Sequence, residues 1–147
     1  MTEKLAIVAG VRTPFCRAGG ELKEVGADVL GAVVARESLY RSGLTADSID
    51  EVIFGNVCQP SDALNIARVV GLRAGLSEFV PAYTVHRNCA SGMEAFTTGM
   101  DKILANRADV ILVGGTESMS NVPLLFSKPM QAWFEEWFRA KRMSQKW

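Results

Sequence analysis

A single cysteine, Cys89, stands where the sequence changes from a strand pattern to a helix pattern. Residues 81–87 favour an extended strand, and small residues followed by a helical pattern come directly after Cys89. The first N–H groups of a helix have no partner within the helix, and its dipole favours negative charge at that end. A thiol placed there is expected to lose its proton more readily, and the thiolate is the form that attacks carbonyl carbon. We predict that Cys89 is a nucleophile, with a buried and inert core cysteine as the alternative.

The only histidine of the chain, His86, lies three residues before Cys89 and suggests a Cys–His pair. On a strand, the side chain of His86 shares a face with Asn88 and points opposite to Arg87. Nothing in the sequence therefore requires the imidazole to meet the thiol. We do not expect His86 to be the activating base.

Composition and charge argue against several classes of function. Sixteen acidic and sixteen basic residues balance, so we expect no nucleic-acid partner and no attraction to anionic membranes. No apolar run approaches the roughly 20 residues that cross a bilayer, and the N-terminus does not resemble a secretory signal. The three cysteines and one histidine form no zinc set, so we expect no metal, and Cys16 and Cys58 are expected to be inert. We expect a cytoplasmic protein of a reducing compartment, with a eukaryotic organelle as the alternative.

The elements that must position Cys89 alternate between strand and helix patterns. Strands are expected at 5–11, 49–57, 81–87 and 109–115, and helices at 27–41, 65–75 and 91–106. Such alternation favours right-handed βαβ units and a parallel sheet that is covered on both faces. We predict an α/β fold of the form βαβαβαβ, with the four strands in the spatial order 3-2-1-4.

The last part of the chain differs in composition from the rest. All three tryptophans lie in the last fifteen residues, beside phenylalanines and several charges. On a helix, aromatic residues spaced four apart would form one face: Trp133 with Trp137, and Phe134 with Phe138. We place one domain at 1–124 and an aromatic helical segment at 125–147. We expect this helix to pack on a core, either that of this chain or one built by residues that this chain does not carry. Contact with a membrane surface is the weaker alternative because two glutamates lie amid the aromatics.

Four stretches resemble, in the same order, the N-terminal part of thiolases, the acetyl-CoA C-acyltransferase family. They are Arg-Thr-Pro-Phe at 12–15, Gly-Asn-Val at 55–57 with Asn-Ile-Ala-Arg at 65–68, Asn-Cys-Ala-Ser-Gly-Met at 88–93, and Gly-Gly-Thr-Glu-Ser-Met-Ser at 114–120. The resemblance covers about residues 4–125, and the last two stretches together are its most specific part. It implies a thiolase-like N-terminal half, with 125–147 as the start of an inserted loop domain.

The resemblance implies ping-pong acyl transfer between a 3-ketoacyl-CoA or acyl-CoA and CoA, as in fatty acid metabolism. Cys89 would be the catalytic residue that carries the acyl group as a thioester, with its own N–H placed to donate to an oxyanion. Coenzyme A would be substrate and product, and no other cofactor is expected. Six residues are candidates for lining the site: Asn88, Ser91, Gly92, Glu117, Ser118 and Met119. For Glu117 and Ser118, the ordering of a loop is an equally good interpretation.

The resemblance also implies parts that this sequence lacks. Thiolases carry an activating histidine and a second cysteine in glycine-rich motifs near the end of a chain more than twice this long, and neither motif occurs here. We therefore expect a truncated thiolase that binds acyl-CoA thioesters and forms a homo-oligomer, a dimer or a tetramer. The main alternative is a non-catalytic half-domain that serves assembly or interaction. A condensing enzyme of the ketoacyl-synthase type is a further alternative, which the sequence motif at 114–120 disfavours.

Overall fold

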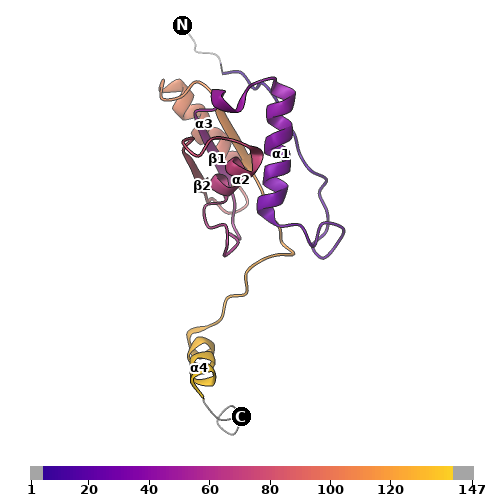
Figure 1. The fold of residues 1–147 in the computed structure, drawn as a ribbon, viewed down its shortest axis with the longest axis vertical. Coiled ribbons are helices and arrows are strands. Elements are labelled where there is room, and N and C mark those ends of the chain that lie inside the picture. Colours follow the sequence, from indigo (N-terminus) through magenta and orange to yellow (C-terminus); the bar gives the residue numbers. More distant parts are fainter. Residues whose placement is uncertain (1–4, 141–147) are drawn as a thin grey trace.

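Short strands alternate with longer helices in the computed structural model, which describes residues 5–140 (Figure 1). The strands are β1 (Glu51–Gly55), β2 (Ala82–Val85) and β3 (Ile111–Gly115). The helices are α1 (Ala27–Ser42), the short 3-10 helix η1 (Ala46–Ser48), α2 (Ile66–Ala74), α3 (Ser91–Leu104) and α4 (Lys128–Arg139). Gly43 and Gly75 follow α1 and α2 with φ of 69° and 97°, the left-handed conformation that commonly ends a helix. The predicted α/β class is confirmed.

The sheet is parallel throughout and has the order β2-β1-β3. In the central strand, Val52 and Phe54 join the buried cluster formed with α1 and α2. Successive side chains of a strand point to opposite faces, so Ile53, which is also buried, faces the other side. That side is covered by α3, which packs on β1 and β3. Helices therefore cover both faces of the sheet, as predicted.

The strand predicted at 5–11 is not formed, and that prediction is wrong. This segment is extended but unpaired, and Ile7 and Val8 are 72% and 62% exposed. The predicted order 3-2-1-4 placed it between 49–57 and 109–115, but β1 and β3 pair directly, with Val52 opposite Leu112. A strand needs a neighbour for its backbone N–H and C=O groups, and within residues 5–140 no strand pairs with this segment. An apolar run indicates a capacity for burial and does not specify the partner.

The start of α2 is fixed by residues of the resembling stretch at 65–68. The Asn65 Oδ1 accepts a hydrogen bond from the Arg68 backbone N–H at 3.4 Å, which caps the helix. The Arg68 guanidinium donates to the backbone carbonyls of Glu78 and Val80, at 2.6 and 2.9 Å. These bonds hold the connection between α2 and β2, the strand that leads to Cys89.

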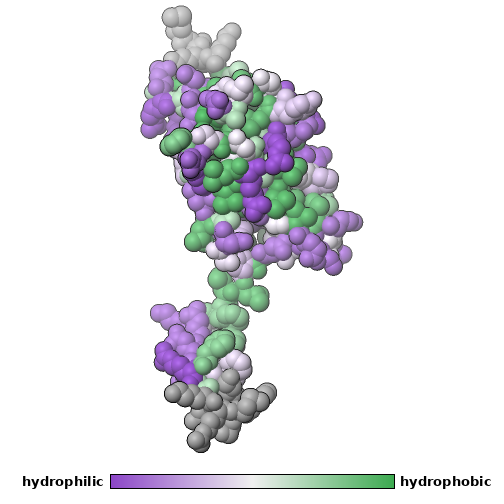
Figure 2. Space-filling view, in the orientation of Figure 1, coloured by the Kyte–Doolittle hydropathy of each residue, from purple (hydrophilic) through white to green (hydrophobic). Residues whose placement is uncertain are grey.

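The helix α4 stands apart from the body, at the end of an apolar connection (Figures 1 and 2). In that connection Leu124 and Leu125 are exposed, and on α4 so are Trp133 and Phe138. The predicted aromatic helix is formed over Lys128–Arg139, but none of its residues is buried, so the expected packing on a core is not seen within residues 5–140. Residues 141–147, including Trp147, lie outside the described residues. Within residues 5–140 no helix is both long and apolar enough to cross a bilayer. The domain boundary at residue 124 stays a prediction.

Candidate active site

Cys89 lies in the turn that joins the end of β2 to the start of α3. The residue before it, Asn88, has φ of 49°, a left-handed conformation that few residues other than glycine adopt and that asparagine tolerates best. The residue after it, Ala90, is the N-cap of α3 and supplies no side-chain cap to the helix. The Cys89 thiol is exposed. The thiol therefore lies beside a helix start, as predicted, and the alternative of a buried core cysteine is wrong.

The backbones of β1, β3 and α3 meet directly behind this turn. A Cβ on Gly55 would lie 2.2 Å from the carbonyl carbon of Ser91 and 2.6 Å from the Gly92 nitrogen. A Cβ on Gly115 would lie 3.0 Å from the Gly92 Cα. Only glycine permits such close approach of backbones. The start of α3 is thus held against the carboxyl ends of β1 and β3, the edge at which open parallel sheets bind ligands.

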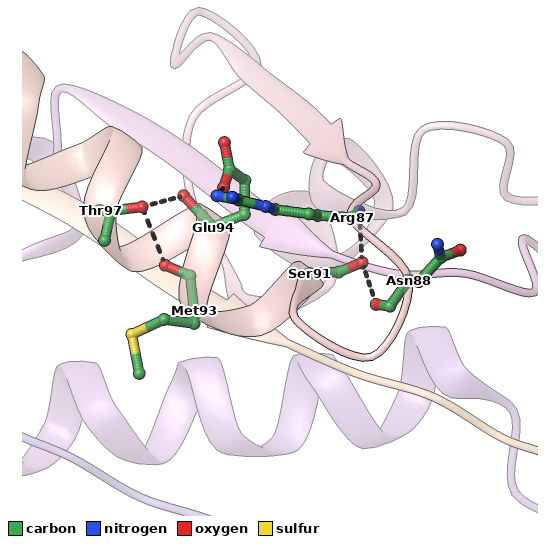
Figure 3. A network of polar contacts seen from close by, with 6 residues as sticks. All are labelled: Arg87, Asn88, Ser91, Met93, Glu94 and Thr97. Carbon is green, nitrogen blue, oxygen red and sulfur yellow. Dashed lines mark hydrogen bonds and ion pairs between the residues drawn. The ribbon is translucent and has the colours of Figure 1, made fainter.

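The Ser91 hydroxyl bridges the two sides of the turn, as Figure 3 shows. It accepts a hydrogen bond from the Arg87 backbone N–H at 2.8 Å and donates one to the Asn88 carbonyl at 2.7 Å. Ser91 is only 4% exposed. On the solvent side, the Arg87 guanidinium forms an ion pair with Glu94 at 2.6 Å. The turn that carries Cys89 is therefore held by hydrogen bonds on its buried side and by an ion pair on its solvent side.

His86 does not take part in this arrangement. Its side chain is exposed, and within the described residues no hydrogen bond joins it to Cys89. A cavity of about 270 Å³ lies beside Ser118 and Cys58, and Cys89 is not among its lining residues. Within residues 5–140, no group of three histidine, cysteine or acidic side chains is placed to hold a metal ion.

Glu117 binds the loop that follows β1. Its carboxylate accepts hydrogen bonds from the backbone N–H groups of Val57 and Cys58, at 2.9 and 3.2 Å, and from the Asn56 amide at 3.1 Å. The same Asn56 amide donates to the Thr116 carbonyl at 2.8 Å. This geometry is that of a carboxylate that orders a loop, one of the two interpretations of Glu117.

The other candidate lining residues divide into two groups. Ser118 donates to the Val25 carbonyl at 2.9 Å and accepts from the Asn121 amide at 2.8 Å, which ties the chain after β3 to the segment before α1. Met119 is 62% exposed. By contrast, Asn88, Ser91 and Gly92 lie around Cys89 itself. As lining residues, all six candidates stay predictions.

Sequence reasoning missed three contributors to this region. Gly55 is the last residue of the buried strand β1 and Asn56 follows it, and a glycine at a strand end signals close backbone approach. The Arg87–Glu94 pair joins the turn to the first turn of α3 and has no signal in the sequence beyond opposite charge.

Two pKa shifts lie at the opposite end of the sheet. Asp50 accepts hydrogen bonds from the backbone N–H groups of Val110 and Asp109, at 2.9 and 2.8 Å. These bonds, the one from Val110 foremost, lower the pKa of the Asp50 carboxyl. The hydrogen bond to Glu51 at 2.6 Å raises the pKa of Lys102. Both carboxylates flank the amino end of β1, so these shifts belong to the packing of the sheet and not to the turn at Cys89.

Comparison with known proteins identifies the family. The chain is 42% identical over 125 residues to an acetyl-CoA acetyltransferase of Syntrophomonas wolfei, covering 85% of this chain and 32% of that protein. It is 36% identical over 144 residues to a 3-ketoacyl-CoA thiolase of Yersinia pestis, covering 98% of this chain and 33% of that protein. The chain thus spans about a third of the length of these relatives.

The fold agrees with the sequence match. The structure superposes with a TM-score of 0.81 on the crystal structure of the Bacillus anthracis acetyl-CoA acetyltransferase, at 36% identity, covering 84% of this chain and 31% of that one. Residues 5–144 match the family model described as thiolase, N-terminal domain. With its parallel sheet and the motif around Cys89, this chain belongs to the thiolase family, in the part that forms the N-terminal domain.

Proposed function

We propose that Cys89 is the nucleophile of a thiolase-type acyl transfer and accepts the acyl group of an acyl-CoA or a 3-ketoacyl-CoA. The observation that carries this proposal is the exposed thiol in a strand-to-helix turn, beside the start of α3. The names of the relatives, an acetyl-CoA acetyltransferase and a 3-ketoacyl-CoA thiolase, support CoA thioesters as the substrate class.

The proposed step is an exchange between two thioesters. The Cys89 thiolate attacks the carbonyl carbon of acetyl-CoA, and a bond forms between Sγ and that carbon. The oxyanion that results is stabilised by a nearby N–H, and the Cys89 backbone N–H is our candidate for this donor. Collapse of the intermediate breaks the bond between the carbonyl carbon and the sulfur of CoA. The departing CoA thiolate takes up the proton that the Cys89 thiol released, so no oxidant or further reactant is needed.

The making or breaking of a carbon–carbon bond requires a base in addition to the nucleophile. The activating histidine and second cysteine that the resemblance implies do not occur in these 147 residues. The exposed His86 has no hydrogen bond to Cys89 in the described part of the chain. We therefore propose that these residues supply the nucleophile, and that they support the first half-reaction without the carbon–carbon step.

Isotope exchange tests this half-reaction directly. The chain is incubated with unlabelled acetyl-CoA and labelled CoA, and the appearance of label in acetyl-CoA is measured. We expect exchange by the wild type and by Cys16→Ser, and none by Cys89→Ser. Exchange by Cys89→Ser at the wild-type rate would refute the proposal. A folded wild type that shows no exchange would instead support the non-catalytic assembly module.

We also propose that the chain forms a homo-oligomer, with a dimer as the first expectation. Within residues 5–140, β2 and β3 are the edge strands of the sheet, and unpaired edges favour association. Sedimentation velocity over a range of concentrations should show a dimer. A monomer at every concentration would contradict this proposal and would leave the acyl-transfer proposal standing.

A further inference from the structure

We propose that Ser91 is a positioning residue for Cys89, and that its buried hydroxyl sets the direction of both the thiol and the Cys89 backbone N–H. This inference rests on the proposed role of Cys89 as a nucleophile. It assigns to Ser91 a task distinct from lining the site, since its hydroxyl is engaged with the backbone on both sides of the turn (Figure 3).

The first argument is the identity of the carbonyl that Ser91 binds. The Asn88 carbonyl belongs to the peptide unit that also contains the Cys89 N–H. It accepts two hydrogen bonds from Ser91, one from the hydroxyl at 2.7 Å and one from the backbone N–H at 3.0 Å. In a trans peptide the C=O and N–H point in opposite directions, and no described peptide bond is cis. Fixing the Asn88 carbonyl toward Ser91 therefore directs the Cys89 N–H away from Ser91.

The second argument is the conformation of the turn. Asn88 is held at φ 49°, which costs conformational free energy in any residue other than glycine. Such a conformation persists only where neighbouring contacts determine it. The Ser91 hydroxyl supplies these contacts on both sides of Asn88, because it also accepts from the Arg87 N–H at 2.8 Å. Ser91 is 4% exposed, so water has little access to replace these bonds.

The third argument is that Ser91 is itself immobile. Its backbone lies against Gly55, where a Cβ would come within 2.2 Å of the Ser91 carbonyl carbon. The hydroxyl therefore projects from a point fixed on the sheet. The Ser91 hydroxyl thereby fixes the position of Cys89 relative to the carboxyl end of β1.

The test compares the reactivity of the three cysteines within one molecule. The chain is treated with iodoacetamide near neutral pH, and the initial rate at each cysteine is read by peptide mass spectrometry. For Ser91→Ala we expect the ratio of the Cys89 rate to the Cys16 rate to fall about fivefold, the factor that corresponds to one ordinary hydrogen bond. The conservative Ser91→Thr, which keeps the hydroxyl, should restore most of the ratio.

The matched control is Thr97→Ala. The Thr97 hydroxyl lies on the same helix and donates to the Met93 and Glu94 carbonyls, both at 3.2 Å, without touching the turn. This variant should leave the ratio unchanged. A folded Ser91→Ala with the wild-type ratio would overturn the inference, and this includes the case in which the rates at Cys89 and Cys16 change by the same factor.

Two further outcomes keep the tests separate. If Ser91→Ala does not fold, Asn88→Val decides, because a β-branched residue opposes φ 49° without removing the hydroxyl. A lower Cys89 ratio in that variant supports the inference, and an unchanged ratio overturns it. If wild-type Cys89 reacts no faster than Cys16, it is the proposed nucleophile itself that fails.

Discussion

Replacing Gly55 by alanine should damage the contact that anchors the start of α3. The added Cβ would lie 2.2 Å from the Ser91 carbonyl carbon, 2.3 Å from its oxygen and 2.6 Å from the Gly92 nitrogen. All three neighbours are backbone atoms, so no change of side-chain rotamer relieves the overlap. Overpacking a buried site costs about 1–3 kcal/mol, and an overlap with rigid backbone belongs at the upper end of that range or above. We expect Gly55→Ala to lower the free energy of unfolding by about 3 kcal/mol or more.

The matched control is the same substitution at Gly71, inside α2. There the added Cβ would be 3.5 and 3.6 Å from the side chains of Val52 and Leu76, which is ordinary contact. Alanine is favoured over glycine in a helix interior by about 1 kcal/mol, so Gly71→Ala should stabilise the protein.

Urea unfolding followed by far-ultraviolet circular dichroism measures both variants. Tryptophan fluorescence is unsuitable because no tryptophan occurs before residue 133 of the sequence, and Trp133 lies on α4, which stands apart from the body (Figure 1). A Gly55→Ala variant within about 0.5 kcal/mol of the wild type, the ordinary range of surface substitutions, would refute the reasoning.

Three further changes test other contacts. Glu117→Gln should lower the free energy of unfolding by about 2 kcal/mol, because its carboxylate accepts charge-assisted bonds from the backbone after β1; a urea midpoint equal to that of the wild type would contradict this. Asp50 has a lowered folded pKa, so its contribution is present above the ordinary pKa of about 4 and is lost as pH falls through the folded value. The stability gap between the wild type and Asp50→Asn should therefore narrow on acidification below about pH 4, and a constant gap would exclude this origin. A double-mutant cycle of Arg87→Gln and Glu94→Gln should show a coupling free energy of unfolding below about 1 kcal/mol, since the Arg87 side chain is largely exposed. A coupling above about 2 kcal/mol would contradict this and would show that the ion pair contributes strongly to stability.

The elements of the fold were predictable where a pattern repeats within one segment. The helical spacing of the apolar residues in α2 and α3 and the apolar runs of β1 and β3 depend on neighbouring residues alone. The run at 5–11 has the same apolar character, but whether it forms a strand depends on a partner elsewhere in space. Direct pairing of β1 with β3 leaves no place for it between them, and no local pattern reports that pairing.

The site shows the same division between local and distant information. The position of Cys89 at a strand-to-helix junction follows from the sequence around it. The left-handed Asn88 was open to prediction, since asparagine is enriched in that conformation. The bridging role of the Ser91 hydroxyl was not, because it depends on the exact path of the turn. The contact of Gly55 with α3 was not open to prediction either, because it joins segments more than thirty residues apart.

The central claim is that the turn before α3 makes one thiol of three reactive toward a CoA thioester. The most direct measurement is the initial rate of acetylation by acetyl-CoA at each cysteine of the wild-type chain, resolved by peptide mass spectrometry. A helix N-terminus stabilises a nearby negative charge by up to about 1 kcal/mol, which is about fivefold in rate. We therefore predict that Cys89 is acetylated faster than the exposed Cys16, by a factor of up to about five. Equal rates at the two thiols, in a folded chain, would contradict the account.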